Sequence, residues 1–145
     1  MISIFKSRRV AQDESHVKNL ILMAKSDNSI DTTEVEVIIQ IGKERGFSEE
    51  EVKEFLRSTE RSKLIPPDDN RDKFDQIFDL TLVMLADGVV EEDELEFVTG
   101  FAHKLGFRKT SSAFIVTRIL EGLEKKLGKN QIYETATRFM NTKLA

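Results

Sequence analysis

The side chains best placed to do chemistry are carboxylates, and they occur twice at the same spacing. Asp27 is followed by Glu34, and Asp87 by Glu94, with the second pair 60 positions after the first. If the fold brings the two segments together, four carboxylates converge. Oxygen ligands are the ones that Mg²⁺ and Ca²⁺ prefer. The sequence therefore offers a divalent-metal site at Asp27, Glu34, Asp87 and Glu94.

A structural role also accounts for these four residues. Glu34 and Glu94 fall in the first turn of two predicted helices, where a negative charge stabilises the helix by roughly 0.3–1 kcal/mol. Asp27 and Asp87 stand in the turns before those helices, where an aspartate side chain can bond to nearby backbone. The sequence leaves both interpretations open, metal binding and helix capping.

Other sets of reactive residues are incomplete. The chain has no cysteine, which excludes disulfides, thiolate ligands and cysteine nucleophiles. A calcium loop starting at Asp27 needs glycine at its sixth position and glutamate at its twelfth, where the chain has Thr32 and Ile38. His16 and His103 lack the glutamate three residues earlier that di-iron bundles use, and we interpret both as surface or capping residues. With no phosphate loop and no nucleophile motif, no catalytic or cofactor-binding residue is assigned.

The elements that must position these residues are helices. Apolar residues recur at helical spacing along the chain, and alternation long enough for a strand does not occur. The periodicity predicts an all-α fold with seven helices, over residues 14–26, 32–45, 49–59, 70–86, 92–105, 111–126 and 131–142. One predicted buried stripe runs through Leu95, Val98, Ala102 and Leu105.

Start and stop signals agree with these helices. Asp31-Thr-Thr-Glu34 and Ser48-Glu-Glu-Glu51 have the spacing of capping boxes, in which two side chains satisfy free backbone N–H groups at a helix start. Glycines follow three of the helical runs, where a left-handed residue ends a helix. These predicted caps are Gly46, Gly106 and Gly128.

The chain contains an internal repeat. Shifted by 60 positions, residues 20–34 align with residues 80–94, and Gly46-Phe47 aligns with Gly106-Phe107. Two such units can share one core about a pseudo-twofold axis. We therefore predict a compact bundle of half-repeats 14–63 and 70–126 joined across Pro66-Pro67, plus a C-terminal helix over 131–142. These form a single domain, 14–145, after an N-terminal strap over residues 1–13.

The acidic turns resemble those of a known family. Ala86-Asp87-Gly88-Val-Val90, with Glu94 four residues on, and the matching Asp27-Asn28-Ser-Ile30 with Glu34, are similar to the motif of the TerB-like tellurite-resistance and stress-response proteins. The resemblance covers residues 14–142. It implies a compact helical domain, bacterial and intracellular, that acts beside membrane or chaperone-linked partners and has no settled enzymatic activity. It also implies divalent-metal binding at acidic positions, which here are Asp27, Glu34, Asp87 and Glu94.

Composition narrows the classes of ligand and location. A formal net charge of −4 argues against nucleic acid as a partner. No run approaches the roughly 20 apolar residues of a membrane span, and we expect a cytoplasmic protein. Residues 1–10 combine Ile2, Ile4 and Phe5 with Lys6, Arg8 and Arg9, a pattern that would allow peripheral membrane attachment. We favour a strap packed on the domain instead.

Two functional hypotheses remain. The first is a non-enzymatic TerB-like module that binds a protein partner in a bacterial stress or tellurite-resistance response, without a cofactor. The acidic clusters at residues 49–51 and 91–96 are solvated faces at helix starts or, alternatively, a negative patch that would steer a basic partner by charge. The alternative is a divalent-metal-binding protein of the Mg²⁺ or Ca²⁺ type, extending to a metal-dependent hydrolase.

Overall fold

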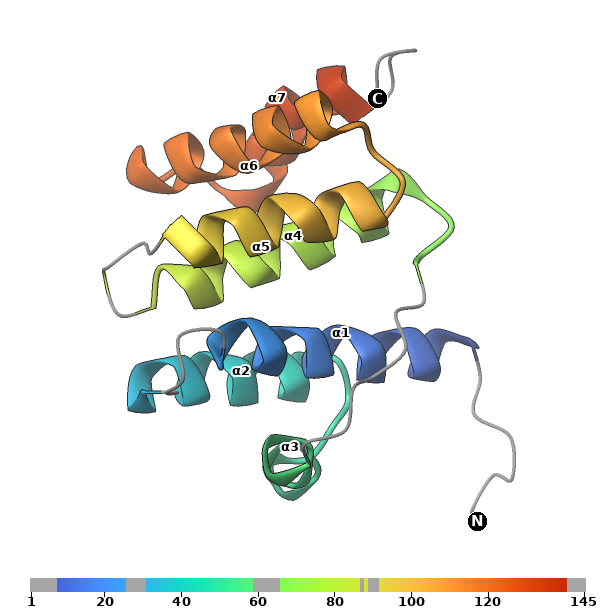
Figure 1. Cartoon of the computed structure of the whole chain (residues 1–145), viewed down its shortest axis with the longest axis vertical. Helices are drawn as coiled ribbons and strands as arrows, with labels where there is room; N and C mark the ends of the chain where they lie inside the picture. Colours follow the sequence, from blue (N-terminus) through green and yellow to red (C-terminus); the bar gives the residue numbers. More distant parts are fainter. Residues whose placement is uncertain (1–7, 26–30, 59–65, 87, 89–91, 141–145) are drawn as a thin grey trace.

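A computed structural model describes residues 8–25, 31–58, 66–86, 88 and 92–140, apart from the side chains of residues 139 and 140. Within these ranges the chain is all-helical and contains no strand, which confirms the predicted fold class (Figure 1). The seven helices are α1 (Arg8–Ala24), α2 (Thr32–Glu44), α3 (Glu49–Arg57), α4 (Asn70–Met84), α5 (Glu92–Lys104), α6 (Lys109–Glu124) and α7 (Lys129–Met140).

Helix boundaries agree with the predicted ones to within two residues, except at the start of α1. This helix begins at Arg8, six residues before the predicted position 14. Residues 8–13, Arg-Arg-Val-Ala-Gln-Asp, are mostly good helix formers, and Arg9 pairs with Asp72 on α4 at 2.8 Å. The described part of the predicted strap is therefore helical, and residues 1–7 lie outside the described residues.

The helix starts carry the predicted caps. Asp31 and Ser48 each accept a hydrogen bond from the backbone N–H three residues on, at 2.8 and 3.1 Å. The glutamates at those positions, Glu34 and Glu51, accept in return from the backbone N–H groups of Asp31 and Ser48. Both capping boxes are confirmed.

The helix ends agree with the prediction at two of three places. Gly46 and Gly106 have φ values of 96° and 117°, as expected of left-handed caps. After α6, however, the left-handed residue is Lys126, with φ 60°, and not Gly128. The N–H of Leu127 bonds to the carbonyl of Gly122 at 2.9 Å. That bond closes the turn with residue 126 in the left-handed position, and Gly128 instead precedes α7, where its carbonyl accepts from the N–H of Ile132.

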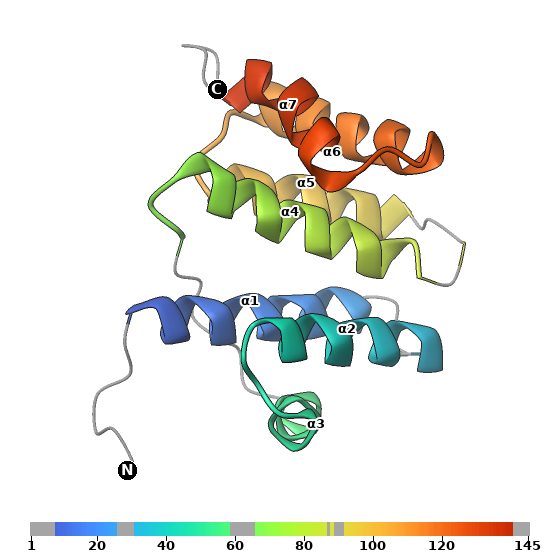
Figure 2. The ribbon, with the colours of Figure 1, turned by 180° about the vertical axis from the view of Figure 1, so that it is seen from behind.

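The helices stack in layers. In Figures 1 and 2, α1 and α2 form one layer and α4 and α5 the next, with α3 outside the first layer and α6 and α7 beyond the second. The runs α1-α2-α3 and α4-α5-α6 each consist of three consecutive helices, and a left-handed glycine follows the second helix of each run. Their relation by a pseudo-twofold axis stays a prediction. The core lies between the layers, and fully buried side chains include Leu20, Ile38, Phe74, Ile77 and Ile115.

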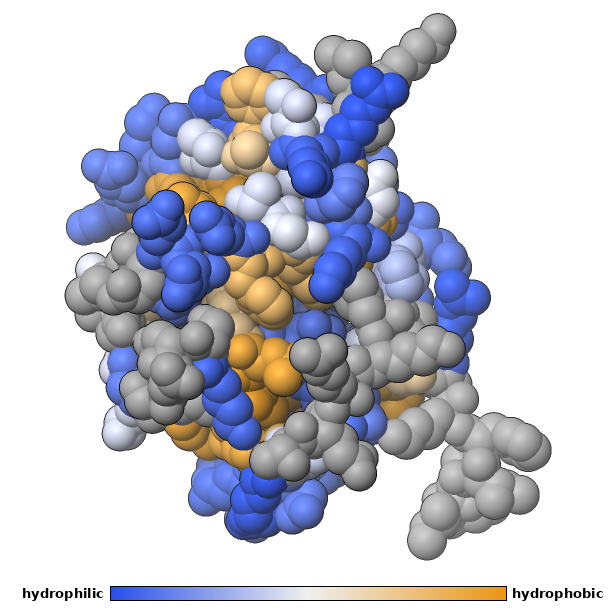
Figure 3. Space-filling model, viewed as in Figure 1, coloured by the Kyte–Doolittle hydropathy of each residue, from blue (hydrophilic) through white to orange (hydrophobic). Residues whose placement is uncertain are grey.

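One predicted core residue lies on the surface. Leu95 is 37% exposed, whereas Val98, Ala102 and Leu105 of the same predicted stripe are buried. Leu95 lines a groove with other α5 residues such as Thr99 and Gly100 and with Lys109, the first residue of α6. Figure 3 shows hydrophobic surface near the middle of one face of the molecule and hydrophilic side chains around it. No helix within the described ranges has the length and apolar character needed to cross a membrane.

Candidate functional site

Of the four predicted metal ligands, the structure describes Glu34 and Glu94. Asp27 and Asp87 lie outside the described residues, so convergence of all four stays a prediction. Glu34 serves as a helix cap, because it accepts a hydrogen bond from the backbone N–H of Asp31 at 3.2 Å. Glu94 stands in the first turn of α5. Among the described residues, no three histidine, cysteine or acidic side chains are grouped to hold a metal ion.

Glu34 and Glu94 share an unusual environment. Each is only 2% exposed, and glutamate is rarely so buried unless it has partners, which both residues have. The start of α2 and the start of α5 lie at the same end of the molecule in both ribbon views (Figures 1 and 2). The structure therefore places these two carboxylates at corresponding points of adjacent layers.

The main cluster of ionisable side chains lies elsewhere, where α1, α2 and α4 meet. His16 Nε2 lies 3.2 Å from Asp79 Oδ2. The guanidinium of Arg45, just after α2, donates to Asp79 Oδ2 at 3.0 Å and to Asp13 Oδ1 at 2.9 Å. We call Asp13, His16, Arg45 and Asp79 the histidine cluster.

Local structure explains how the histidine cluster forms. Asp13 and His16 are three residues apart on α1 and therefore share a helix face. Arg45 is positioned by the end of α2, where the left-handed Gly46 turns the chain. Its side chain is 15% exposed, and those of Asp13 and Asp79 are 13% and 12% exposed. The cluster thus ties three helices together at the edge of the core.

Sequence reasoning missed this cluster. The interpretation of His16 as a surface or capping residue is wrong, because its side chain is fully buried. A signal was present in the repeat, since His16 aligns with Gln76 and Asn19 with Asp79 at the shift of 60. All four are buried on α1 and α4. When polar residues occupy matching positions on two helix faces that are otherwise apolar, they predict a polar contact between the two helices.

The second histidine behaves as expected. His103, in the last turn of α5, is exposed and its Nδ1 lies 2.7 Å from the carbonyl oxygen of Phe107. Because a carbonyl only accepts, the ring N–H donates, and the bond links the last turn of α5 to the segment before α6. The surface alternative predicted for His103 is confirmed, because the residue is exposed.

Burial and charge set the protonation of the histidine cluster. Burial lowers the pKa of His16, and although the hydrogen bond to Asp79 opposes this, the Arg45 charge lowers the pKa further. Burial alone would raise the pKa of Asp79, but the hydrogen bond from His16 and the charge of Arg45 bring it below its usual value. At neutral pH we therefore assign a neutral His16 that donates from Nε2–H to an ionised Asp79. The Nδ1 atom of His16 has no hydrogen-bond partner among the described residues.

A polar cleft of about 330 Å³ lies beside the histidine cluster. Its other walls include Arg9 and the pair formed by Lys129 and Asp75, whose charged atoms are 3.2 Å apart. Arg9 pairs with Asp72. The charged side chains in this cleft therefore largely neutralise one another. Their ion pairs connect neighbouring helices.

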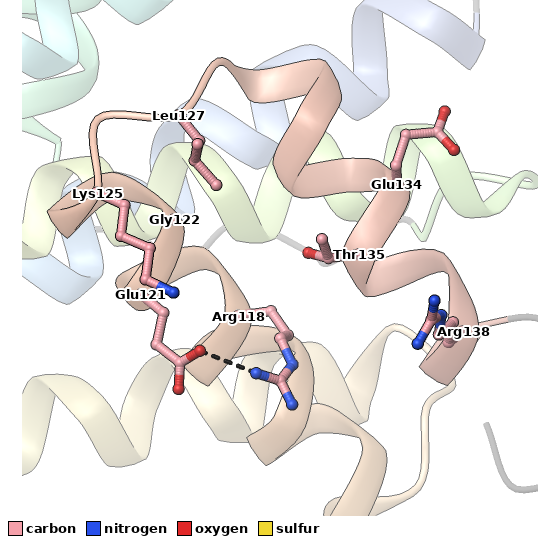
Figure 4. A pocket seen from close by; sticks show the side chains of 8 residues that line it. All are labelled: Arg118, Glu121, Gly122, Lys125, Leu127, Glu134, Thr135 and Arg138. Carbon is pink, nitrogen blue, oxygen red and sulfur yellow. Dashed lines mark hydrogen bonds and ion pairs between the residues drawn. The ribbon is translucent and has the colours of Figure 1, made fainter.

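A second cleft, of about 600 Å³, opens between α6 and α7. Figure 4 shows Arg118, Glu121 and Lys125 beside it on the α6 side and Arg138 on α7, with Glu134 pointing away. Arg118 and Glu121 form an ion pair at 2.8 Å. The side chains of Lys125 and Arg138 are exposed and form no ion pair with any described residue. We call this feature the α6–α7 groove.

Comparison of the chain with models of protein families, with curated proteins and with solved structures finds no match.

Proposed function

We propose that the chain is a non-enzymatic, TerB-like protein-interaction module that takes part in a bacterial stress or tellurite-resistance response in the cytoplasm. The resemblance of its two acidic turns to the TerB-like motif supports the family. The state of its buried pair of titratable residues supports a non-enzymatic role.

That pair is His16 and Asp79, and it is the observation that carries the proposal. A catalytic histidine and carboxylate need a free lone pair or proton at the reacting atom. Here Asp79 Oδ2 accepts from both His16 and Arg45. The remaining lone pair, on His16 Nδ1, meets no described partner, but His16 is fully buried, so a substrate does not reach it. The pair therefore joins α1 to α4 and has a structural role. We look for the function of the molecule in its binding surfaces instead.

Affinity capture tests this function. The tagged full chain serves as bait in a lysate of cells of the organism whose genome encodes it. Untagged chain is added in excess as a competitor. We expect one or a few proteins whose recovery falls with the competitor. If every recovered protein is insensitive to the competitor, the chain does not act as an interaction module.

A second candidate function is divalent-metal binding at the acidic turns. The burial of Glu34 and Glu94 at one end of the molecule favours it, because a buried carboxylate is stabilised by a cation. Calorimetric titration with Mg²⁺, Ca²⁺, Mn²⁺ and Zn²⁺ should then reveal a site that is lost in Asp27→Asn/Asp87→Asn and kept in the exposed control Glu50→Gln. Absence of both binding heat and thermal shift with all four metals would eliminate this candidate.

A further inference from the structure

We infer that the α6–α7 groove binds an acidic segment of the partner protein, with acidic side chains paired to Lys125 and Arg138 and an apolar side chain against Leu127. This inference rests on the proposed interaction function and specifies its surface and the chemistry of its partner. The charges, the floor and the size of the groove support it.

Cationic side chains surround the groove. Arg118, Lys125 and Arg138 flank one opening (Figure 4). Glu121 neutralises Arg118 at 2.8 Å, and Glu134 points away from the opening. Lys125 and Arg138, on opposite sides of the groove, therefore form an ion pair with no described residue, in a chain whose net charge is −4. A local excess of positive charge on an acidic protein selects for an anionic partner segment.

The floor supplies an apolar contact. Gly122 has no side chain, and a Cβ there would overlap atoms of Ile132 on α7, so the two helices approach closely at this point. Leu127 stands at the end of the groove and is 36% exposed. The hydroxyl of Thr135 is already bonded to the carbonyl of Ile132 at 2.8 Å. Because Ile132 is itself fully buried, Leu127 supplies the exposed apolar contact, and the cations supply most of the available polar contacts.

The shape favours a peptide segment over a small ion. The groove follows two packed helices, is about 600 Å³ in volume and is open along one side. An inorganic anion would use the cations and leave Leu127 uncovered. A segment that carries both acidic and aliphatic side chains satisfies the cations and covers the leucine, so its charge and its apolar part both contribute.

Titration of the full-length ¹⁵N-labelled chain tests the inference by NMR. The probe is the peptide acetyl-Glu-Leu-Glu-Glu-Leu-Glu-amide, and the comparisons are acetyl-Lys-Leu-Lys-Lys-Leu-Lys-amide and inorganic phosphate at equal concentration. The groove variant is Lys125→Glu/Arg138→Glu. The control variant, Lys43→Glu/Lys104→Glu, makes the same change in net charge at two exposed lysines in the last turns of α2 and α5.

We expect the acidic peptide to shift amides of α6 and α7 in a saturable way. Its affinity should fall about tenfold in the groove variant, as loss and reversal of two exposed ion pairs imply, and stay within about twofold in the control variant. The inference is overturned if the acidic peptide gives no localised shifts, if both variants weaken it equally, or if the basic peptide or phosphate shifts the same amides to the same extent. Because this titration needs no lysate, its failure is separate from failure of affinity capture.

Discussion

His16 on α1 and Asp79 on α4 share a buried hydrogen bond of 3.2 Å that spans the two halves of the sequence. Asp79 accepts a second bond from Arg45 at 3.0 Å, so one carboxylate joins a histidine and an arginine from two other elements. This contact fixes how the layer of α1 and α2 sits on the layer of α4 and α5. It also makes the stability of the fold depend on pH.

Stability should fall below about pH 6.5 because of His16. Its pKa is lowered in the folded protein, so the unfolded chain binds a proton at a pH where the folded chain does not. The stabilisation is complete above the ordinary pKa of about 6.5 and is lost as the pH falls toward the lower folded value. Urea unfolding at pH 7.5 and 5.5 should show a loss of up to about 1.4 kcal/mol in the wild type. The His16→Gln variant should lack this pH-dependent loss of unfolding free energy. An identical pH dependence in both proteins would refute the assignment to His16.

Arg45 should contribute far more stability than an exposed arginine. Arg45→Ala removes the nearest cation from both Asp13 and Asp79 in a poorly hydrated site and leaves Asp13 only Arg9 at 3.9 Å, which should cost about 3 kcal/mol. The control is Arg57→Ala, because Arg57 pairs with Glu54 at 2.8 Å while both side chains are more than half exposed. That change should stay within about 0.5 kcal/mol. If chemical denaturation shows equal losses of unfolding free energy in Arg45→Ala and Arg57→Ala, the histidine cluster does not hold the helices together.

Two exposed glycines should respond to alanine in opposite directions. Gly46 has φ 96° and open space where a Cβ would lie, so Gly46→Ala meets only backbone strain and should cost about 1 kcal/mol. Gly100 lies inside α5 with equally open surroundings and has no positive φ. Gly100→Ala should therefore raise the free energy of unfolding by about 0.5–1 kcal/mol. Thermal denaturation compares the stability of the two variants. A loss of stability in Gly100→Ala would contradict the described path of α5.

Lys126 should be a site where glycine stabilises the protein. It has φ 60° in the turn after α6, a conformation that costs a residue with a side chain about 1–2 kcal/mol. Lys126→Gly removes that cost, and after the greater freedom of glycine in the unfolded chain is counted, a gain of about 0.5–1 kcal/mol should remain. Lys125→Gly is the matched control, since Lys125 has φ −81°. If both variants lose stability in urea unfolding, the turn differs from the one described.

The parts of the fold that depend on nearby residues could be predicted from the sequence. Helical periodicity predicts all seven helices, and the capping boxes at Asp31 and Ser48 are contacts between residues three apart. The left-handed residue after α6 is predicted at the wrong position, because Gly128 is a better left-handed residue by type than Lys126. The bond from Leu127 to Gly122 decides the position, and composition does not reveal it.

The histidine cluster depends on packing and could not be predicted from periodicity. His16, Arg45 and Asp79 are separated by 29 and 34 positions in the sequence, and their contact requires the relative placement of three helices. The polar residues that match across the repeat were a usable signal, but hydrophobic periodicity ignores polar positions. Leu95 illustrates the same limit, because periodicity shows which residues share a helix face and packing decides whether that face is covered.

The proposed role of the chain is to bind a partner protein through the α6–α7 groove. Quantitative affinity capture from a lysate of the organism's own cells tests this role most directly. The three baits are the wild type, Lys125→Glu/Arg138→Glu and Lys43→Glu/Lys104→Glu. We expect wild type and the Lys43/Lys104 control to recover the same competitor-sensitive partner, and the groove variant to recover about a tenth as much. Equal recovery by all three folded baits would contradict a role for the groove, and the absence of any competitor-sensitive partner would contradict the proposed function itself.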